Sequence, residues 1–525
     1  MADTLQQLLR ERAAQDTIAI KYDDRRITWR EHVADAARQA AALLAAADPN
    51  RPPHIAVLLG NTPDMLTALA GAALGGYVLC GINTTRRGAA LARDVERVDA
   101  QILITDAEHR HLLDGLELPG VTVFDTSTTE WARLLAAAPE LTPHREVTPD
   151  DTFMMIFTSG TSGEPKAVQV PHSTVLFSGT ALVDRYQLGS ADTCYLAMPL
   201  FHSNAVYAGW SVAVGAGAAM APATFSASRF LHDIRRYGAT YMNYVGKPLA
   251  YILATPEKPD DHDNPLRIAF GNEATDRDIE AFSRRFGCTV WDGFGSTEIA
   301  VIITRPDDCP PGSVGKGFPG VAIYNPETLQ ECSVARFDAN GALINPDEAI
   351  GELVNTAGAG LFRGYYNDPQ ATDERMRHGM YWSGDLAYRD ADGWIYLAGR
   401  TADWMRVDGE NLTAAPIERI LLRLPAINRA AVYPVPDELV GDQVMAAVVL
   451  QDELTPRQFA DFLAAQTDLS PKAWPRYVWV ADDLPVTATN KVLKRELIAR
   501  GTAPDGRVLW RRDGAQYHVY AESDE

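Results

Sequence analysis

Apolar and polar positions in the first four hundred residues alternate between short buried runs and longer helical stretches. The runs His54–Leu59 and Gln101–Thr105 are apolar and too short for helices, so they predict buried strands. Helices are predicted at Pro63–Ala73 and at about Ala89–Val98, and a further strand at Thr152–Phe157. This succession of strands and helices predicts an α/β fold with largely parallel sheets.

The pattern changes near residue 400. Apolar positions then mark one face of a helix, at Ile417, Ile420, Leu421 and Leu424. Strands are expected at about Ala430–Val435, Val444–Leu450 and Tyr477–Val480, with a helix at about Pro456–Ala465. We therefore predict an N-terminal domain of residues 1–400 and a small α+β C-terminal domain of residues 401–525.

Composition and charge narrow the class of protein. The chain has 525 residues and a formal net charge of -21, and so acidic a surface disfavours nucleic acid or anionic lipid as a partner. The five cysteines are scattered without C-x-x-C spacing, which argues against a disulfide framework or zinc site and favours a reducing, cytoplasmic location. The N-terminus, MADTLQQLLRERAAQD, has no apolar signal-peptide core.

The stretch Thr193–Ser228 contains no Asp, Glu, Lys or Arg. It is nearly long enough to cross a bilayer, but it is rich in Gly and Ala and contains Pro222. We predict a buried helix and strand here, no transmembrane segment, and a soluble protein.

The segment TSGTSGEPK, residues 158–166, follows an apolar strand and carries the strongest chemical signal. Glycines allow backbone N–H groups to approach phosphates, hydroxyls donate hydrogen bonds, and Lys166 neutralises charge. A surface turn rich in Ser and Gly is the plainer alternative, but it does not account for the lysine or for the preceding strand. The predicted phosphate-binding residues are Thr158, Ser159, Gly160, Thr161, Ser162, Gly163 and Lys166.

This loop resembles the phosphate loop of the adenylate-forming superfamily, which comprises acyl- and aryl-CoA synthetases, luciferases and peptide-synthetase adenylation domains. The other motifs of that superfamily occur in the same order, as MPLFH at 198–202, GFGSTE at 293–298, YWSGD at 381–385, Gly399-Arg400, VDGEN at 407–411 and TATNK at 487–491. The resemblance covers almost the whole chain.

The resemblance implies a role for each motif. Lys491, Glu298, Lys166 and His202 would be catalytic, His202 would gate the acyl pocket, and Glu298 with Thr161 would hold Mg²⁺. Further nucleotide contacts would come from Gly271, Asn272, Gly293, Phe294, Gly295, Thr297, Asp385 and Arg400. A loop for thioester formation with coenzyme A would contain Gly409, Glu410 and Asn411.

For three of these residues the sequence also allows a simpler, purely structural interpretation. Glu298 could be a solvated loop carboxylate, His202 a core histidine and Asp385 a turn residue. Magnesium nevertheless requires hard oxygen ligands, and two ribose hydroxyls suit a carboxylate acceptor.

The chain departs from the superfamily pattern in four places. Phe294 replaces a tyrosine, Asn490 replaces a glycine, and Ala402, followed by Asp403, stands at the hinge. The usual Gly-Gly-Ala-Pro adenine segment is replaced by Phe270-Gly271-Asn272-Glu273. This form most resembles the branch of fatty-acid-transport proteins and very-long-chain synthetases.

We therefore predict an AMP-forming acyl-CoA synthetase that uses ATP, Mg²⁺ and coenzyme A. The carboxylate would attack the α-phosphorus of ATP, and the thiol would then displace AMP from the acyl-adenylate. The resemblance implies that Lys491 and the loop at 409–411 take turns at one site, by rotation of a mobile C-terminal domain about residues 400–403. The uncharged Thr193–Ser228 stretch favours an apolar acid. The predicted pocket residues are His202, Gly209, Trp210, Val214, Tyr244 and Gly246.

Two alternatives stay open at this point. The acceptor could be the phosphopantetheine of a carrier protein, or oxygen chemistry could follow adenylation. The chain could also be a non-catalytic protein that binds acyl groups or nucleotides. The sequence does not give the length or ring structure of the acid, or the oligomeric state, for which a homodimer is one option.

Overall fold

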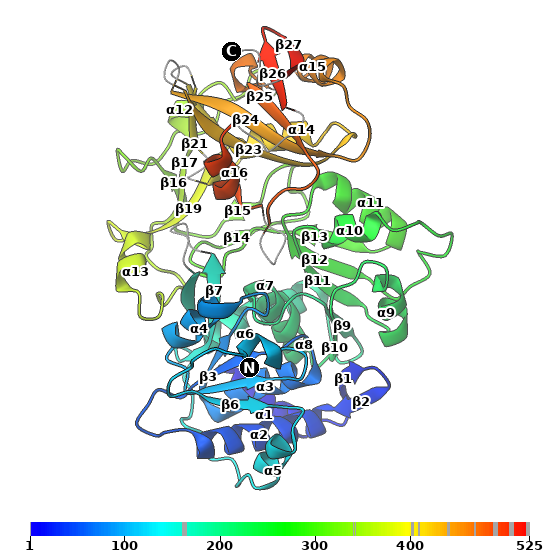
Figure 1. Cartoon of the computed structure of the whole chain (residues 1–525), viewed down its shortest axis with the longest axis vertical. Coiled ribbons are helices and arrows are strands. Elements are labelled where there is room, and N and C mark those ends of the chain that lie inside the picture. The colour runs from blue at the N-terminus through cyan, green and yellow to red at the C-terminus, as the bar shows by residue number, and fades with distance from the viewer. Residues whose placement is uncertain are drawn as a thin grey trace. The chain divides into compact units, whose positions relative to one another are not determined.

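The computed structural model describes residues 2–159, 165–339, 341, 343–400, 404–407, 410–437, 441–466, 469–486, 492–502 and 509–520. The described chain divides into two compact units, Met1–Ala300 with Ala359–Glu374 and Val301–Gly358 with Arg375–Glu525. Figure 1 labels the elements of both units. The domain boundary expected at 400–403 stays a prediction, and residues 401–403 lie outside the described part.

The first sheet of unit 1 contains the strand that precedes the predicted phosphate loop. Its order is β6-β5-β3-β4-β7-β8, with Thr122–Asp125, Ile102–Thr105, His54–Leu58, Val78–Gly81, Thr152–Ser159 and Pro165–Pro171. All neighbours are parallel except β8, which runs antiparallel to β7. The predicted strands at 54, 101 and 152 are confirmed as β3, β5 and β7. The strand β8 was not predicted from the sequence; it pairs antiparallel with β7, and the Gly-rich residues 160–164 between the two strands lie outside the described part.

The second sheet of unit 1 is also largely parallel. Its order is β13-β12-β11-β9-β10-β1-β2, with Thr289–Asp292, Ile268–Asn272, Tyr241–Val245, Thr193–Leu196, Ala219–Pro222, Ile18–Tyr22 and Arg25–Thr28. Only the edge pair of β1 and β2 is antiparallel among the described pairings.

The uncharged Thr193–Ser228 stretch folds as predicted into buried strand and helix. Between β9 and β10 lie α7 (Ser203–Ala205), the π-helix η2 (Val206–Trp210) and α8 (Ser211–Ala216). A π-turn inside a helix is rare and is often found at functional sites. Within the described ranges, no helix combines the length and the apolar character that crossing a membrane requires.

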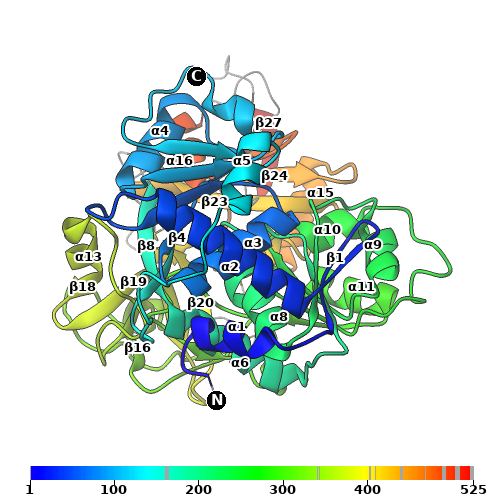
Figure 2. The ribbon, with the colours of Figure 1, turned by 90° about the horizontal axis from the view of Figure 1, so that it is seen from below.

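Helices cover the sheets of unit 1, and local signals fix where they begin. Thr28 and Glu31 form a capping box at the start of α2, and Pro63 occupies the first turn of α3. In Figure 2, α2 lies alongside α3. Besides α7, η2 and α8, the described helices of this unit are α1 (Leu5–Arg12), α2 (Trp29–Ala46), α3 (Pro63–Gly75), α4 (Gly88–Arg97), η1 (Arg110–Leu113), α5 (Thr129–Ala136), α6 (His172–Tyr186), α9 (Phe230–Tyr237), α10 (Pro248–Leu253), α11 (Asp276–Phe286) and α13 (Pro369–Arg375).

Unit 2 contains short antiparallel sheets and the C-terminal α+β region. One sheet has the order β16-β17-β19-β18 with β20 beside β19, at Val321–Tyr324, Gly351–Asn355, Met380–Arg389, Met376–Arg377 and Ile395–Arg400. The strands β14 (Ile303–Thr304) and β15 (Lys316–Gly317) pair separately, and α12 spans Pro346–Ala349.

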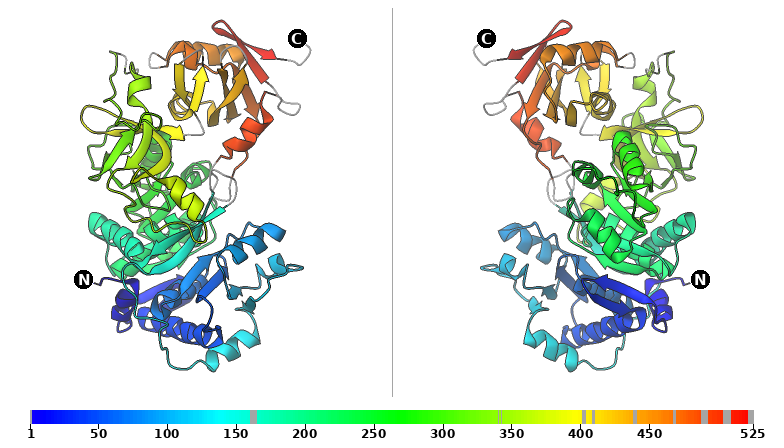
Figure 3. Two further views of the ribbon diagram at one scale, coloured as in Figure 1. Left: turned by 90° about the vertical axis from the view of Figure 1, so that its left-hand side faces the viewer. Right: turned by 90° about the vertical axis from the view of Figure 1, so that its right-hand side faces the viewer.

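The C-terminal sheet has the order β22-β21-β24-β25-β26-β27, with β23 beside β24. These strands span Glu410–Thr413, Trp404–Val407, Gly441–Leu450, Tyr477–Ala481, Leu509–Asp513, Gln516–Tyr520 and Ile427–Asp437. The helices are α14 (Ala414–Leu421), α15 (Pro456–Ala464), η4 (Pro471–Ala473) and α16 (Lys494–Arg500). Phe459 of α15 packs on Trp510 and Tyr517 of the β26–β27 hairpin. Figure 3 shows the backbone of α15, in orange, beside this hairpin, in red. The elements predicted beyond residue 400 and the α/β class are thereby confirmed.

Buried histidines should make unit 1 sensitive to acid. Burial lowers the pKa of His172 in α6 to about 4, and its ring packs on Phe153. Between about pH 6.5 and pH 4 the unfolded chain therefore binds a proton that the folded chain does not, so stability falls as the pH falls. We expect His172→Leu to reduce the slope of unfolding free energy against pH by up to about 1.4 kcal/mol per pH unit in this window. Urea unfolding at graded pH measures the slope.

The exposed His262 provides the matched control for this measurement. His262→Leu should keep the wild-type slope, because the His262 side chain is exposed to solvent in the folded chain as well. An unchanged slope in the His172→Leu variant would contradict the prediction.

Candidate active site

Lys166 is held by the β7–β8 hairpin. It lies opposite Thr158 in the antiparallel register and is only 6% exposed. Its Nζ lies 5.2 Å from the ring centroid of Tyr365 and 3.8 Å from Oε2 of the exposed Glu374. The ammonium is thus almost buried between an aromatic face and a carboxylate. Other predicted loop residues lie outside the described part of the chain, namely Gly160, Thr161, Ser162, Gly163 and the side chain of Ser159.

Glu298 lies in the loop that follows β13. It is partly buried, and its Oε1 accepts a hydrogen bond of 2.8 Å from the hydroxyl of Tyr365. The next residue, Ile299, has a φ of 43°, in the left-handed region that a β-branched residue rarely adopts. Such strain costs about 1–3 kcal/mol and is concentrated at functional sites.

The segment that follows His202 contacts the same loop. The hydroxyls of Ser203 and Thr297 share a hydrogen bond of 2.9 Å, and the hydroxyl of Tyr207 donates to the carbonyl of Thr297 at 2.9 Å. Burial, with a smaller contribution from the Glu298 carboxylate, raises the pKa of Tyr207 well above its ordinary value. Tyr207 therefore stays a neutral donor and fixes the backbone next to Glu298.

A chain of amide side chains connects the predicted adenine loops to the predicted acyl pocket. Asn272 Nδ2 donates to the carbonyl of Gly293 at 2.6 Å, and Asn272 Oδ1 accepts from Asn204 at 3.1 Å. Asn204 in turn accepts from Asn243 at 2.7 Å. Gly271 packs so tightly that a Cβ would lie 2.3 Å from the carbonyl oxygen of Tyr244, so only glycine fits.

The other predicted members of these loops lie close by. Gly293, Phe294 and Gly295 form the extended segment between β13 and Thr297. Hydrogen bonds thus connect Asn272 to Gly293 directly and Thr297 to the segment 203–207. The contact of these residues with a nucleotide stays a prediction.

His202 lies at the N-terminus of α7, next to Phe201. Burial lowers its pKa to about 4, so the ring is neutral at physiological pH. Its buried Nε2 has no hydrogen-bond partner among the described residues. A neutral ring without a fixed partner suits a gate beside an apolar pocket better than a general base.

The remaining predicted acyl-pocket residues are mostly buried. Trp210 stacks on Phe153 with centroids 5.5 Å apart, and Val214 is fully buried. A Cβ at Gly209 would meet Asn243 Oδ1 at 2.9 Å and Leu196 Cδ2 at 3.0 Å, so Gly209 is packed against β9 and β11.

Two predicted pocket residues lie at the C-terminal end of β11. The hydroxyl of Tyr244 donates to Asp292 Oδ2 at 3.0 Å, and Gly246, with a φ of 68°, donates its N–H to the carbonyl of Asn272. These two residues therefore connect the proposed pocket wall to the adenine loops.

Asp385 lies in unit 2, on β19. It is 7% exposed, its backbone N–H donates to Ser383 Oγ at 3.0 Å, and it pairs with Arg400 in the β19–β20 register. The preceding Gly384 has a φ of 77° and donates its N–H to the buried Glu352. Hydrogen bonds thus fix the backbone of β19 at Gly384 and Asp385. The side chains of Arg400, Glu410 and Asn411, and all of Gly409 and Lys491, lie outside the described residues.

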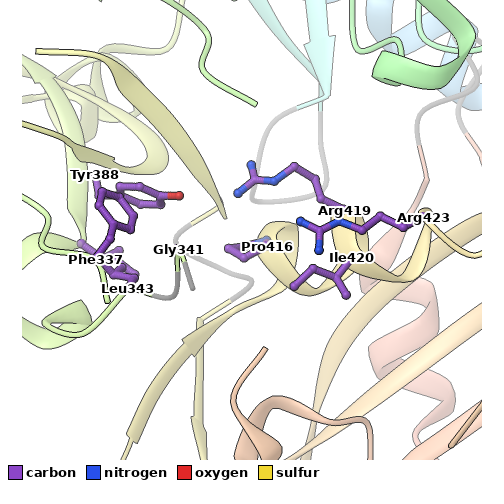
Figure 4. A pocket seen from close by; sticks show the side chains of 9 residues that line it. Phe337, Gly341, Leu343, Tyr388, Pro416, Arg419, Ile420 and Arg423 are labelled. Carbon is purple, nitrogen blue, oxygen red and sulfur yellow. The ribbon is translucent and has the colours of Figure 1, made fainter. Parts of the chain in front are cut away.

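A further pocket in unit 2 contains none of the predicted site residues. Figure 4 shows Arg419 of α14 and Arg423, which follows this helix, on one side and Phe337 and Tyr388 on the other. Arg419 Nη1 already donates to the carbonyl of Leu397 at 2.9 Å.

The sequence analysis missed several residues of the site. Tyr365 touches both Lys166 and Glu298, and Tyr207, Asn204 and the other contacts of the loop at 293–298 were not singled out. Asn204 lies two residues from His202, so its polar side chain in an uncharged stretch was the available signal. No motif around Tyr365 indicates a functional role, because its partner Glu298 lies 67 residues away in the sequence.

Comparison with known proteins gives the same assignment. Residues 9–366 match the AMP-binding enzyme family, and residues 416–491 match the AMP-binding enzyme C-terminal domain. The medium/long-chain-fatty-acid–CoA ligase FadD17 of Mycobacterium marinum is 51% identical, over 95% of this chain and 96% of the relative. The steroid-22-oyl-CoA synthetase of Rhodococcus jostii is 43% identical, over 99% and 96%.

The fold agrees with a solved structure. ATP-bound MatB from Rhodopseudomonas palustris superposes with a TM-score of 0.83 at 24% identity, covering 95% of this chain and 99% of that one. The relatives confirm the predicted enzyme class, an AMP-forming acid–thiol ligase, whereas the finer resemblance to the fatty-acid-transport branch stays a prediction. The chain therefore belongs to the AMP-binding enzyme family, the adenylate-forming superfamily that its motifs resemble.

Proposed function

We propose that the protein is an ATP-dependent acyl-CoA synthetase that activates a medium- or long-chain fatty acid or another largely apolar acid. The observation that carries this proposal is the convergence of Lys166 and Glu298 on one tyrosine. A phosphate-binding cation and a metal-binding carboxylate placed together are what phosphoryl chemistry on a nucleotide requires.

We propose that Lys166 and Glu298 act in adenylation. The acid attacks the α-phosphorus of ATP and pyrophosphate leaves, so negative charge develops on the phosphates. An almost buried ammonium is a strong stabiliser of that charge, because solvent screens it little. Lys491 is proposed, from the resemblance, as a second cation in the same step.

The residues present fit a magnesium ion. Within the described ranges, Glu298 Oε2 accepts no hydrogen bond, whereas Oε1 is oriented by Tyr365. Magnesium in nucleotide enzymes is bound by one or two carboxylates together with substrate phosphates and waters, so one oriented carboxylate suffices. The ion supplies charge neutralisation on the phosphates, Glu298 would hold it, and Thr161 is proposed as a further ligand.

The acid is proposed to lie beside the segment 202–214. This segment carries no Asp, Glu, Lys or Arg, and burial keeps His202 neutral, so it offers no charge to pair with a second charge on the acid. Relatives named for medium- and long-chain fatty acids and for a steroid acid favour the same apolar class. We propose that coenzyme A is the acceptor and that Asp385 binds the ribose.

The test is a screen of carboxylic acids of graded chain length, with a steroid side-chain acid included. We expect pyrophosphate release with medium or long acids, and thioester formation together with rapid AMP release only when coenzyme A is added. Adenylation without any effect of coenzyme A would favour a carrier protein as the acceptor. Failure of every acid to release pyrophosphate would contradict catalysis.

A cytoplasmic location is part of this proposal. All five cysteines are free, as expected for a reducing compartment.

A further inference from the structure

Tyr365 lies between the two charged groups proposed for adenylation, all within unit 1. It is 4% exposed, its hydroxyl donates to Glu298 Oε1 at 2.8 Å, and its ring centroid is 5.2 Å from Lys166 Nζ. The distance to Lys166 is within the range of a cation–π contact. One side chain therefore contacts a carboxylate through its polar tip and an ammonium through its face.

The backbone around Tyr365 is fixed to the strand that carries Lys166. Tyr365 forms an antiparallel bridge with Val168 of β8, and the flanking residues Gly364 and Tyr366 exchange backbone hydrogen bonds with Gln169 and Ala167. The segment thus runs beside β8 as an added strand. The phenol cannot shift unless the Lys166 strand shifts with it.

Further contacts hold the segment from the other side. The N–H of Tyr365 donates to Thr372 Oγ1 at 3.0 Å, and the ring packs edge-on against Phe362 at 5.1 Å. Gly364, with a φ of 94°, makes the turn into this geometry, which residues with a Cβ adopt poorly. The hydroxyl position is therefore set before any substrate binds.

We propose that Tyr365 is a positioning residue for adenylation, which orients Glu298 as a magnesium ligand through its hydroxyl and supports Lys166 through its ring. This inference rests on the proposed function. A carboxylate that binds a metal generally needs a hydrogen-bond partner, and loss of such a partner lowers metal affinity or activity about 10- to 100-fold.

The test compares Tyr365→Phe with Tyr366→Phe. The first change removes only the hydroxyl on Glu298 and keeps the ring over Lys166. The second removes the neighbouring hydroxyl, which donates to Asp99 at 2.9 Å. Affinity for a non-hydrolysable ATP analogue is measured by calorimetry, once with Mg²⁺ and once with EDTA.

We expect Tyr365→Phe to weaken binding about tenfold or more with Mg²⁺ and to leave it unchanged with EDTA. Tyr366→Phe should match the wild type in both. Tyr365→Leu, which also removes the ring from Lys166, should weaken binding even with EDTA. Equal weakening of Tyr365→Phe in both conditions, or no weakening with Mg²⁺, would overturn the inference.

A double mutant separates positioning of Glu298 from a general structural effect. In a Glu298→Gln background, Tyr365→Phe should add nothing further to the loss of Mg²⁺-dependent affinity, because the two residues act as one unit. A full additive loss would indicate that Tyr365 acts elsewhere. Pyrophosphate release by the wild type tests the proposed function separately, since it does not depend on the outcome for Tyr365.

Discussion

Glu298→Ala is expected to lower the rate of pyrophosphate formation by about a hundredfold or more, as for loss of one preorganised stabiliser of charge. The change removes the carboxylate that we propose for magnesium, at a step in which charge develops on the phosphates. The thermal midpoint without ATP should hardly move, because Glu298 is a partly exposed loop residue outside the core. Pyrophosphate release from acid and ATP measures the first effect and a thermal melt the second.

The exposed loop residue Glu257 provides a control of the same chemistry. Glu257→Ala removes one negative charge from unit 1 and should leave both measurements at their wild-type values. A folded Glu298→Ala protein with near-normal turnover would show that the magnesium role belongs to another residue. An equal loss with Glu257→Ala would show that net charge, rather than position, is responsible.

Local patterns in the sequence were sufficient for several of the strands and helices. The strand β3 and the helix α3 follow from an apolar run and from Pro63, both of which act over a few residues. Lys166 was proposed from its Gly- and hydroxyl-rich motif after a strand, and Glu298 from the resemblance. In the structure the side chains of Lys166 and Glu298 both contact Tyr365, as expected if the two motifs belong to one site.

Long-range pairing could not be predicted from local patterns. The position of β9 between β11 and β10 depends on contacts between distant segments, and no single strand encodes its neighbour. The π-helix Val206–Trp210 differs from an α-helix only in which carbonyl each N–H reaches, so apolar periodicity does not reveal it. The antiparallel pairing of β7 with β8 could have been predicted from the sequence, because two apolar runs separated by a Gly-rich stretch are typical of a β-hairpin.

The second prediction with a large expected effect concerns Lys491. Its catalytic role is inferred from the resemblance, and the residue lies outside the described part of the chain. If Lys491 acts only while acyl-AMP forms, Lys491→Ala should abolish pyrophosphate release from acid and ATP. The same variant, given preformed acyl-AMP and coenzyme A, should make thioester at close to the wild-type rate. An interaction made in only one transition state affects only that step, so the two half-reactions must separate. Rapid quench of each half-reaction measures both rates.

A bulky substitution of Gly409 is the matched counterpart and should reverse the pattern. Adenylate should form normally, but thioester formation should fail, because a glycine backbone allows the pantetheine arm to pass closely. Opposite losses in the Lys491 and Gly409 variants would support two faces of the C-terminal domain that alternate at one site by rotation about a hinge. Equal loss of both half-reactions in Lys491→Ala would indicate a fixed site instead. If neither half-reaction fell, the lysine role would not belong to the segment 487–491, and Asn490 in place of the usual glycine would be the first feature to examine.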